Sequence, residues 1–153
     1  MTAPAPASVL PLAAPPRVVS LEAFVVRIPL KTTIRHASHS RDSSDNLVVR
    51  ATLDDGSVGY GEGVPRDYVT GETVAVGVDL LRRTNWADQL PLPENFAAAV
   101  RALRDLELPA VPGDERGCVG NAARCAAELA LLDAFGKSFG EPVSAAVALP
   151  EYA

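Results

Sequence analysis

The two histidines of this chain, His36 and His39, lie three residues apart and are followed at further steps of three by Asp42 and Asp45. Imidazole nitrogens and carboxylate oxygens are common metal ligands, so this set could form a cation site. The surrounding stretch is rich in serine and shows no helical or strand periodicity that would bring the four side chains together. A solvated polar loop is therefore the preferred interpretation, and metal binding is the alternative.

Three alternate glycines, Gly59, Gly61 and Gly63, surround Glu62 and could be taken for a phosphate-binding loop. The stretch lacks the Lys-Ser/Thr pair of a P-loop, and no helix opens directly after it. Alternate glycines in a strand instead indicate that another backbone approaches closely. Glu62 could serve as a general base, but no acid partner accompanies it, so a hydrogen-bonded structural role is favoured.

A second polar cluster, Arg66, Asp67 and Tyr68, follows Pro65. In a functional interpretation, the guanidinium of Arg66 binds a carboxylate and the ring of Tyr68 packs over a ligand. In a structural interpretation, the cluster belongs to a solvated loop. Both interpretations stay open.

The segment at residues 70–73, Thr-Gly-Glu-Thr, leads from this cluster into a helix. Thr70 or Thr73 is expected to cap that helix. The carboxylate of Glu72 is expected to favour the positive end of the same helix.

Three strands in the first half of the chain must position these groups. Residues 18–30 form a β-branched and aromatic run, and residues 47–53 alternate apolar with polar side chains, which predicts a strand with one buried face. Asp55 and Gly56 provide a tight hairpin turn, and the chain returns through residues 58–60. Three strands joined in this way form an antiparallel meander, one face of which must be covered.

The second half of the chain has helical spacing and supplies that cover. Apolar residues recur at helical steps over residues 73–83 and 96–106. Asn121 is expected to cap a last helix, with Gly136 at its C-terminal end. This helix carries a stripe of small residues that lets another backbone approach: Ala123, Ala126, Ala127, Ala130 and Ala134. The predicted fold class is α+β: a three-stranded antiparallel meander followed by a bundle of about three helices.

The composition fits one modest domain and excludes several classes of function. The 153 residues carry a net charge of −5, without the basic cluster that nucleic-acid phosphates require. No apolar run approaches the 18 or so residues of a membrane span. Cys118 and Cys125 are expected to stay reduced, with a disulfide as the alternative, and residues 1–16 lack the features of a secretory signal. The protein is therefore expected in the cytoplasm.

Two segments together carry a resemblance to a known family: GYGEGVP at residues 59–65 and AARCAAELALLDAFGKSFGEPV at residues 122–143. With the meander and its Asp-Asp-Gly turn, they are similar to the N-terminal capping domain of the enolase superfamily, nearest its mandelate racemase and muconate-lactonizing branch. The resemblance implies a capping domain at residues 17–143. A proline-rich extension at residues 1–16 is expected to be disordered, and residues 144–153 are expected to begin a truncated linker or barrel segment.

The resemblance implies that the chemistry belongs to a parent enzyme, with no catalytic residue, metal ligand or cofactor in this chain. In that family, Mg²⁺ held by carboxylates of a (β/α) barrel stabilises the enediolate that forms when a barrel lysine or histidine removes the proton α to a carboxylate. The parent is expected to be a racemase, epimerase, cycloisomerase or dehydratase. The expected partners are a barrel, in cis or in trans, and a small carboxylate substrate bound through that barrel.

The same resemblance assigns two loops that fold over the barrel mouth, at residues 31–44 and 62–72. Such loops exclude water and contact the part of the substrate distant from the reacting carbon. The residues expected to make these contacts are Ile34, Arg35, His36, Arg66 and Tyr68.

Two other classes of function remain as alternatives to a capping domain. The first is a stand-alone interaction domain that docks on a separately encoded barrel or self-associates as a homo-oligomer. The second is a small independent enzyme using His36, His39 or Glu62, which would turn over without a partner. The capping domain is the preferred hypothesis, and it predicts no turnover by the isolated chain.

Overall fold

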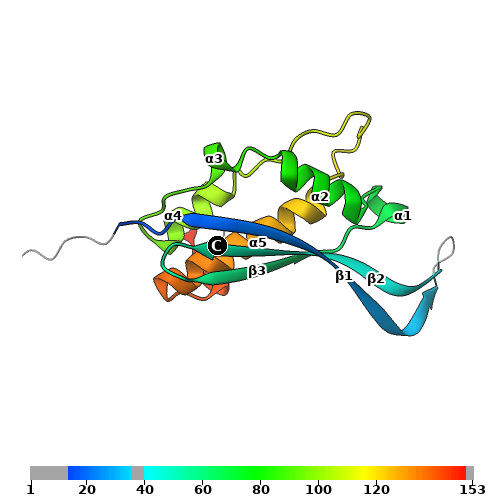
Figure 1. Cartoon of the computed structure of the whole chain (residues 1–153), viewed down its shortest axis with the longest axis horizontal. Helices are drawn as coiled ribbons and strands as arrows, with labels where there is room; N and C mark the ends of the chain where they lie inside the picture. Colours follow the sequence, from blue (N-terminus) through cyan, green and yellow to red (C-terminus); the bar gives the residue numbers. More distant parts are fainter. Residues whose placement is uncertain (1–13, 36–39, 151–153) are drawn as a thin grey trace, which may run out of the picture.

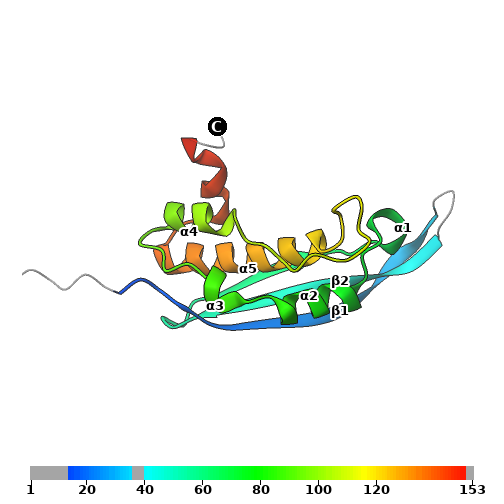
Figure 2. The same ribbon diagram turned by 90° about the horizontal axis from the view of Figure 1, so that it is seen from above.

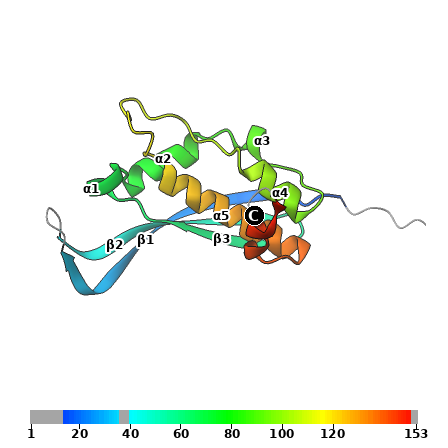
Figure 3. The same ribbon diagram turned by 180° about the vertical axis from the view of Figure 1, so that it is seen from behind.

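The computed structural model describes residues 14–35 and 40–150, which fold into two layers (Figure 1). One layer is a three-stranded sheet, and the other is a set of helices on a single face of that sheet, as Figure 2 shows. The longest helix, α5 (Asn121–Phe139), lies across this face, as the view from behind shows (Figure 3). The predicted α+β class is confirmed.

The sheet has the order β1-β2-β3 and is formed by β1 (Val18–Arg35), β2 (Ser40–Leu53) and β3 (Val58–Gly63), each antiparallel to its neighbour. The turn between β2 and β3 is tight, because Gly56 has φ +88° and its amide donates to the Leu53 carbonyl at 3.1 Å. The predicted meander and its hairpin turn are therefore confirmed.

The hairpin of β1 and β2 is longer than the sequence predicts. The prediction ended the first strand near residue 30 and placed a loop over residues 31–44, whereas β1 runs to Arg35 and β2 begins at Ser40. The register becomes irregular after Pro29, which has no backbone N–H to donate. Neither face of this end of the hairpin is deeply buried, so its sequence has no apolar alternation that would have shown the pairing.

The part of the chain that the structure describes has five α-helices and one 3-10 helix: α1 (Asp67–Thr70), α2 (Val74–Arg83), α3 (Trp86–Gln89), α4 (Phe96–Leu103), α5 and η1 (Val143–Ala148). The three longer helices correspond to those that the periodicity predicts. The single turns α1 and α3 were not predicted, because four residues are too few to show a helical period. Thr73 caps α2, since its hydroxyl accepts from the Val76 amide at 3.2 Å.

Both predicted ends of α5 were wrong. The N-cap is Gly120, with φ +104°, and Asn121 is already helical. Gly136 lies inside the helix, where a Cβ would come within 2.6 Å of the Glu141 carbonyl oxygen, so this glycine serves close packing. The helix ends at Gly140, which has the positive φ of +71° that a C-terminal glycine commonly adopts.

The interface between β3 and α5 is a contact of backbone against backbone. A Cβ built on Gly59, Gly61 or Gly63 would lie 1.9–2.2 Å from a carbonyl oxygen of the helix. The helix meets these glycines with alanines at steps of four: Ala122, Ala126, Ala130 and Ala134. The predicted close approach at the glycines is confirmed. Ala126, Ala130 and Ala134 belong to the predicted alanine stripe, whereas Ala122 was not part of it.

The free edge of β3 is closed by side chains of α5. The Tyr60 amide donates to Asp133 Oδ2 at 2.9 Å, and Lys137 Nζ donates to the Val58 carbonyl at 2.8 Å. Asp133 and Lys137 also form an ion pair at 2.7 Å. An edge strand whose polar groups are bonded in this way is a poor template for pairing with another chain.

The sheet face opposite the helices carries exposed apolar side chains. Residues that lie opposite each other in antiparallel strands share a face, which places on this side Phe24, Val26, Ile28 and Tyr60, each between 38% and 54% exposed. Among the described residues, no helix covers this face (Figure 2).

Two further expectations concern the whole chain. Over residues 14–35 and 40–150, no helix combines the length and the apolarity needed to cross a membrane. Cys118 and Cys125 are both free, which confirms the reduced pair. Cys125 is exposed, but partial burial of its thiol raises the pKa of that thiol, which lowers the share of thiolate at neutral pH.

Candidate functional site

A polar groove of about 360 Å³ lies where the β1–β2 hairpin passes the loop after β3. One wall consists of Arg27 and residues 40–45, and the other of residues 65–68 and 72–74. The hairpin extends beyond the helical layer at this end of the molecule, and α1 lies beside it (Figures 1 and 2). The charged residues of the groove are Arg27, Arg41, Arg66, Asp42, Asp45, Asp67 and Glu72.

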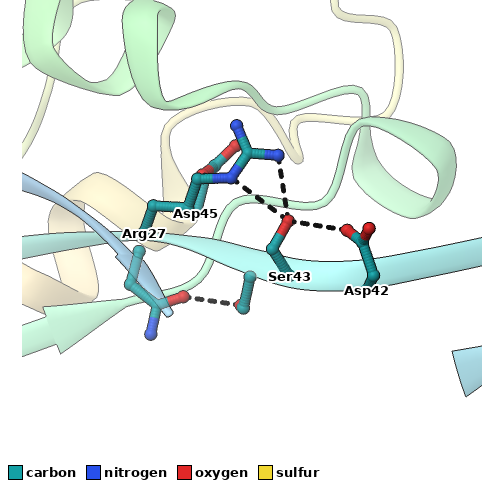
Figure 4. Close-up of polar contacts among 6 residues, drawn as sticks. Arg27, Asp42, Ser43 and Asp45 are labelled. Atoms are coloured by element: carbon teal, nitrogen blue, oxygen red, sulfur yellow. Dashed lines mark hydrogen bonds and ion pairs between the residues drawn. The ribbon is translucent and has the colours of Figure 1, made fainter. Parts of the chain in front are cut away.

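The hairpin wall contains a polar network that joins the two strands (Figure 4). Arg27 donates from Nε and Nη2 to Ser43 Oγ at 3.2 and 3.0 Å, and its Nε lies 3.7 Å from Asp45 Oδ1. The Ser43 hydroxyl donates to Asp42 Oδ1 at 3.1 Å. Because the Arg27 side chain is 70% exposed, solvent screens the ion pair, and its main effect is to orient charge along the wall.

The opposite wall is the single turn α1, which the chain enters through Arg66. Arg66 is the N-cap with extended backbone, and Gly71 ends the turn with φ +80°. The Nη1 of Arg66 donates to the Tyr68 hydroxyl at 3.3 Å, so these two half-buried residues lie together. A guanidinium has five N–H donors, and a planar pair of them suits a carboxylate.

Arg41, on β2, is the third arginine of the groove. Its Nε is buried and has no hydrogen-bond partner among the described residues. A buried donor without an acceptor costs free energy, and a ligand that brings an acceptor to this position would remove that cost.

Glu72 differs from its predicted role. The sequence suggested that it favours the positive end of α2, but its Oε1 accepts from the amides of Gly120 and Ala122, at the start of α5. The difference has a simple cause: Thr73 already caps α2, and the Glu72 side chain turns away into the body of the protein, where it is 6% exposed.

The structure brings together some of the predicted site residues and separates others. Arg66 and Tyr68 line the groove. Ile34 and Arg35 are exposed near the end of the hairpin, opposite Arg41 and Ser40, and do not line it. His36 lies outside the described residues, as does His39, so the interpretations placed on them stay predictions.

The sequence-based reasoning missed Arg27 and Arg41, which the structure places in the groove. Pairing Arg27 with Asp45 across the hairpin would have indicated a polar wall, since opposite residues share a face. That pairing can be recognised only when the register of β1 against β2 is known. A polar segment without a buried face does not reveal its register.

No arrangement for a metal ion is found in the part of the chain that the structure describes. No group of three or more His, Cys, Asp or Glu side chains is placed to bind a cation there. Residues 14–35 and 40–150 therefore provide no site that fits Mg²⁺. Glu62, proposed as structural, is hydrogen-bonded to the Asn46 amide, as expected.

Comparison with known sequences identifies related enzymes. No family model matches the chain. The N-succinyl-L-Arg/Lys racemase of Bacillus cereus is 24% identical over 127 residues, which cover 83% of this chain and 32% of the racemase. The L-Lys-D/L-Arg epimerase of Methylococcus capsulatus is 31% identical over 83% of this chain and 33% of the epimerase.

Solved structures agree with the sequence matches. The dipeptide epimerase from Methylococcus capsulatus, complexed with Mg and the dipeptide L-Arg-D-Lys, matches with a TM-score of 0.64 and 28% identity over 83% of this chain. The chain spans about a third of the length of these two curated relatives.

Proposed function

This chain is an N-terminal domain of the enolase superfamily, related to racemases and epimerases, and we propose that it is the capping domain that selects the substrate of such an enzyme. The observation that carries the proposal is the groove, because both predicted capping segments contribute to its walls. Arg66 and Tyr68 on one wall and Arg41 on the other contact the part of the substrate distant from the reacting carbon.

The proposed substrate is a small amino-acid derivative or dipeptide with a charged side chain. The names of the two relatives support this class: an N-succinyl-L-Arg/Lys racemase and an L-Lys-D/L-Arg epimerase. The mixed charge of the groove also supports it. Arginines such as Arg41 and Arg66 suit a carboxylate, and carboxylates such as Asp42 and Asp67 suit a cationic side chain.

The proposed parent reaction removes the proton α to a carboxylate and returns it on the opposite face. In the family this chemistry uses Mg²⁺ and acid–base groups of a barrel. The described residues provide no metal site, and we assign no chemical step to this chain. The barrel is the proposed partner, in cis or in trans.

The first test is to read the coding sequence that follows the Ala153 codon in all three forward frames. A frame that encodes a barrel, with a Lys-x-Lys segment and three spaced carboxylates, is the expected result. The absence of such a frame would contradict a barrel in cis and favour the interaction domain described below.

A functional test is a chimera in which residues 17–143 replace the corresponding domain of the Methylococcus capsulatus epimerase. Exchange of the substrate α-proton in D₂O, followed by NMR with dipeptides and N-succinyl amino acids, is expected for the chimera and not for the isolated chain. A folded chimera that exchanges none of these substrates would contradict the proposal. Exchange by the isolated chain would favour the small independent enzyme.

A second candidate function is an interaction domain. The sheet face opposite the helices favours it, because exposed apolar patches mark association surfaces. Its exposed apolar residues, which lie beside the charged Glu22 and Arg50, are Phe24, Val26, Ile28 and Tyr60. Sedimentation of the chain over a range of concentrations tests self-association. Replacement of Phe24 by Ser should shift the chain towards monomer if this face is the interface.

We propose the cytoplasm as the place of action. The support is the pair of free cysteines, Cys118 and Cys125, since free thiols are typical of reducing compartments. A membrane-impermeant thiol reagent is expected to label the exposed Cys125 only after cell lysis. Labelling of intact cells would contradict this location.

A further inference from the structure

Glu72 is a buried carboxylate at the base of the loop that carries Arg66 and Tyr68. Its Oε1 accepts hydrogen bonds from the Gly120 amide at 3.0 Å and from the Ala122 amide at 2.8 Å. Both amides belong to the first turn of α5, 48 and 50 residues further along the chain. The loop is therefore fastened to the longest helix of the domain by one side chain.

The other carboxylate oxygen of Glu72 continues the connection towards Arg66. Thr70 Oγ1 lies 2.8 Å from Glu72 Oε2 and 3.0 Å from the Arg66 carbonyl oxygen, and its single proton can be donated to either acceptor. The Arg66 carbonyl also accepts from the Thr70 amide at 2.8 Å, which closes the turn of α1. A continuous set of hydrogen bonds thus joins the helix to Arg66 on the groove wall.

The start of α5 is shaped to receive this carboxylate. Gly120 has φ +104°, and a Cβ there would also lie 3.1 Å from Leu80 Cδ1, so a larger residue would disturb the turn that directs the amides at Glu72. The first amides of a helix have no partner within the helix and carry the positive end of its dipole. A carboxylate satisfies both conditions, which explains how a charged side chain can be 6% exposed here.

We propose that Glu72 is the positioning residue of the groove: by binding the first turn of α5, it sets the place of α1 and with it the place of Arg66 and Tyr68. The importance of this position for substrate binding rests on the function proposed above. The hydrogen bonds of Glu72 do not, because they form within this chain. Thr70 is the link between Glu72 and Arg66. Arg116, whose Nη1 donates to the Val69 carbonyl at 3.2 Å in an exposed contact, is a weaker second support.

The test is amide hydrogen exchange measured residue by residue on the full chain by NMR. Glu72→Ala is expected to speed exchange at Thr70, Gly71, Gly120 and Ala122 by about tenfold or more, because local opening is governed by local bonds. Glu72→Gln keeps the Oε1 acceptor and is expected to restore most of the protection. If it exchanges as fast as the alanine variant, the proposed acceptor role is wrong.

Thr70→Val removes the hydroxyl that links Glu72 to Arg66 and keeps the bonds of Glu72 to α5. It is expected to speed exchange at Thr70 and Gly71 while leaving Gly120 and Ala122 unchanged, because Glu72 still caps α5. This variant also provides a result if Glu72→Ala does not fold. Unchanged exchange at Gly71 in Thr70→Val would overturn the link to Arg66.

Leu53→Ala is the control for a purely structural role. Leu53 is 1% exposed in the core at the far end of β2, and its loss lowers global stability without touching the loop. The proposal expects selective exchange in the loop for Glu72→Ala and uniform acceleration for Leu53→Ala. Equal patterns in the two variants would overturn it.

Kinetic measurements on the same variants in the epimerase chimera test the role of Glu72 and the proposed capping function independently. A loosened loop that raises KM more than it lowers kcat is expected if both are right. A loosened loop with unchanged kinetics would overturn the capping role while leaving the fastening by Glu72 intact. An ordered loop in Glu72→Ala would overturn the fastening alone.

Discussion

The interface of β3 with α5 and the groove at the hairpin end are built in opposite ways. At the interface, glycines face alanines, and a single added carbon would overlap a helix carbonyl oxygen. At the groove, long charged side chains such as Arg27 lie largely in solvent and bond to neighbours on their own hairpin. The interface cannot accept a larger side chain unless its backbones move apart. The exposed side chains of the groove can be replaced without moving the backbone.

This difference distinguishes the rigid scaffold, which is the interface of β3 with α5, from the groove, which is the proposed ligand-binding region. Close backbone packing leaves no side chain that could adjust to a substitution, so it fixes the position of β3 and hence of the loop that follows it. Functional side chains gather on loops that a rigid scaffold positions. We therefore expect substitutions at the interface to act on stability, and substitutions of groove side chains other than the buried Glu72 to act on binding.

The largest effect is expected for Gly61→Ala. The new methyl group would lie about 2.1 Å from the Ala126 carbonyl oxygen, so β3 and α5 would have to separate. Overpacking of this kind is expected to lower the free energy of unfolding by about 3 kcal/mol. Urea denaturation followed by circular dichroism measures it.

Gly113→Ala is the matched control for Gly61→Ala. Gly113 has φ +82° and no atom within 4 Å of an added Cβ, so only backbone strain opposes the substitution. Its cost is expected to be about 1 kcal/mol. If the two variants were equally stable, the contrast between a tight interface and an open surface would be wrong.

The next effect is expected for Asp133→Ala, which opens the edge of β3. The substitution leaves the Tyr60 amide without its acceptor and removes the partner of Lys137, at an expected cost of about 1–2 kcal/mol in unfolding free energy. Asp79→Ala breaks a similarly spaced ion pair with Arg83 on α2, but that pair is more exposed and binds no strand. Its cost is expected to stay below about 0.5 kcal/mol. Equal costs would show that the bond to β3 adds nothing.

A smaller effect is expected in acid. The Ser138 hydroxyl, with further help from Ser57, holds the pKa of Asp55 below its ordinary value of 3.8. A lowered pKa in the folded state means that ionised Asp55 stabilises the fold above that ordinary value, and that this contribution is lost as the pH falls through the folded pKa. Asp55→Asn should therefore flatten the loss of stability between pH 5 and pH 3, by less than about 1 kcal/mol because the group is largely solvated.

Asp114, in the segment before α5, is expected to contribute to acid stability in the same way as Asp55. The Val119 amide donates to its carboxylate at 2.7 Å and holds its pKa below the ordinary value, so the sign of the pH dependence is the same. Urea titrations of Asp55→Asn, Asp114→Asn and the exposed control Asp105→Asn at pH 7, 5 and 3 measure the effect. A steeper acid loss in either of the first two variants would contradict the assignment.

The rigid region could be predicted from the sequence, because its signals are local. Alternation over residues 47–53 identified the buried face of β2, and the alternate glycines and the alanine stripe each indicated close approach of a backbone. The sequence did not pair those two signals with each other. Their match follows from spacing: glycines two apart on a strand and alanines four apart on a helix advance by about the same length.

The groove was predicted only in part, because its contacts are long-range. Arg66 and Tyr68 were found because they follow a recognisable strand end. Glu72 was assigned to the adjacent helix, since nothing in the local sequence shows that Gly120, 48 residues away, is its partner. The length of the hairpin was missed because a polar hairpin end has no buried face to reveal its register.

The smallest effect on stability is expected for Arg66→Ala. Its bond to the Tyr68 hydroxyl joins two half-buried side chains at the surface, so the change in unfolding free energy should stay within about 0.5 kcal/mol. In the epimerase chimera, the same substitution should raise KM about tenfold, the loss of roughly 1.4 kcal/mol of binding energy to a substrate carboxylate. Arg82→Ala, an exposed arginine in the last turn of α2, is the control and should change neither quantity. An Arg66→Ala variant that loses several kcal/mol of stability while keeping its KM would reverse the contrast, because the groove wall would then be part of the scaffold and the substrate would be selected elsewhere.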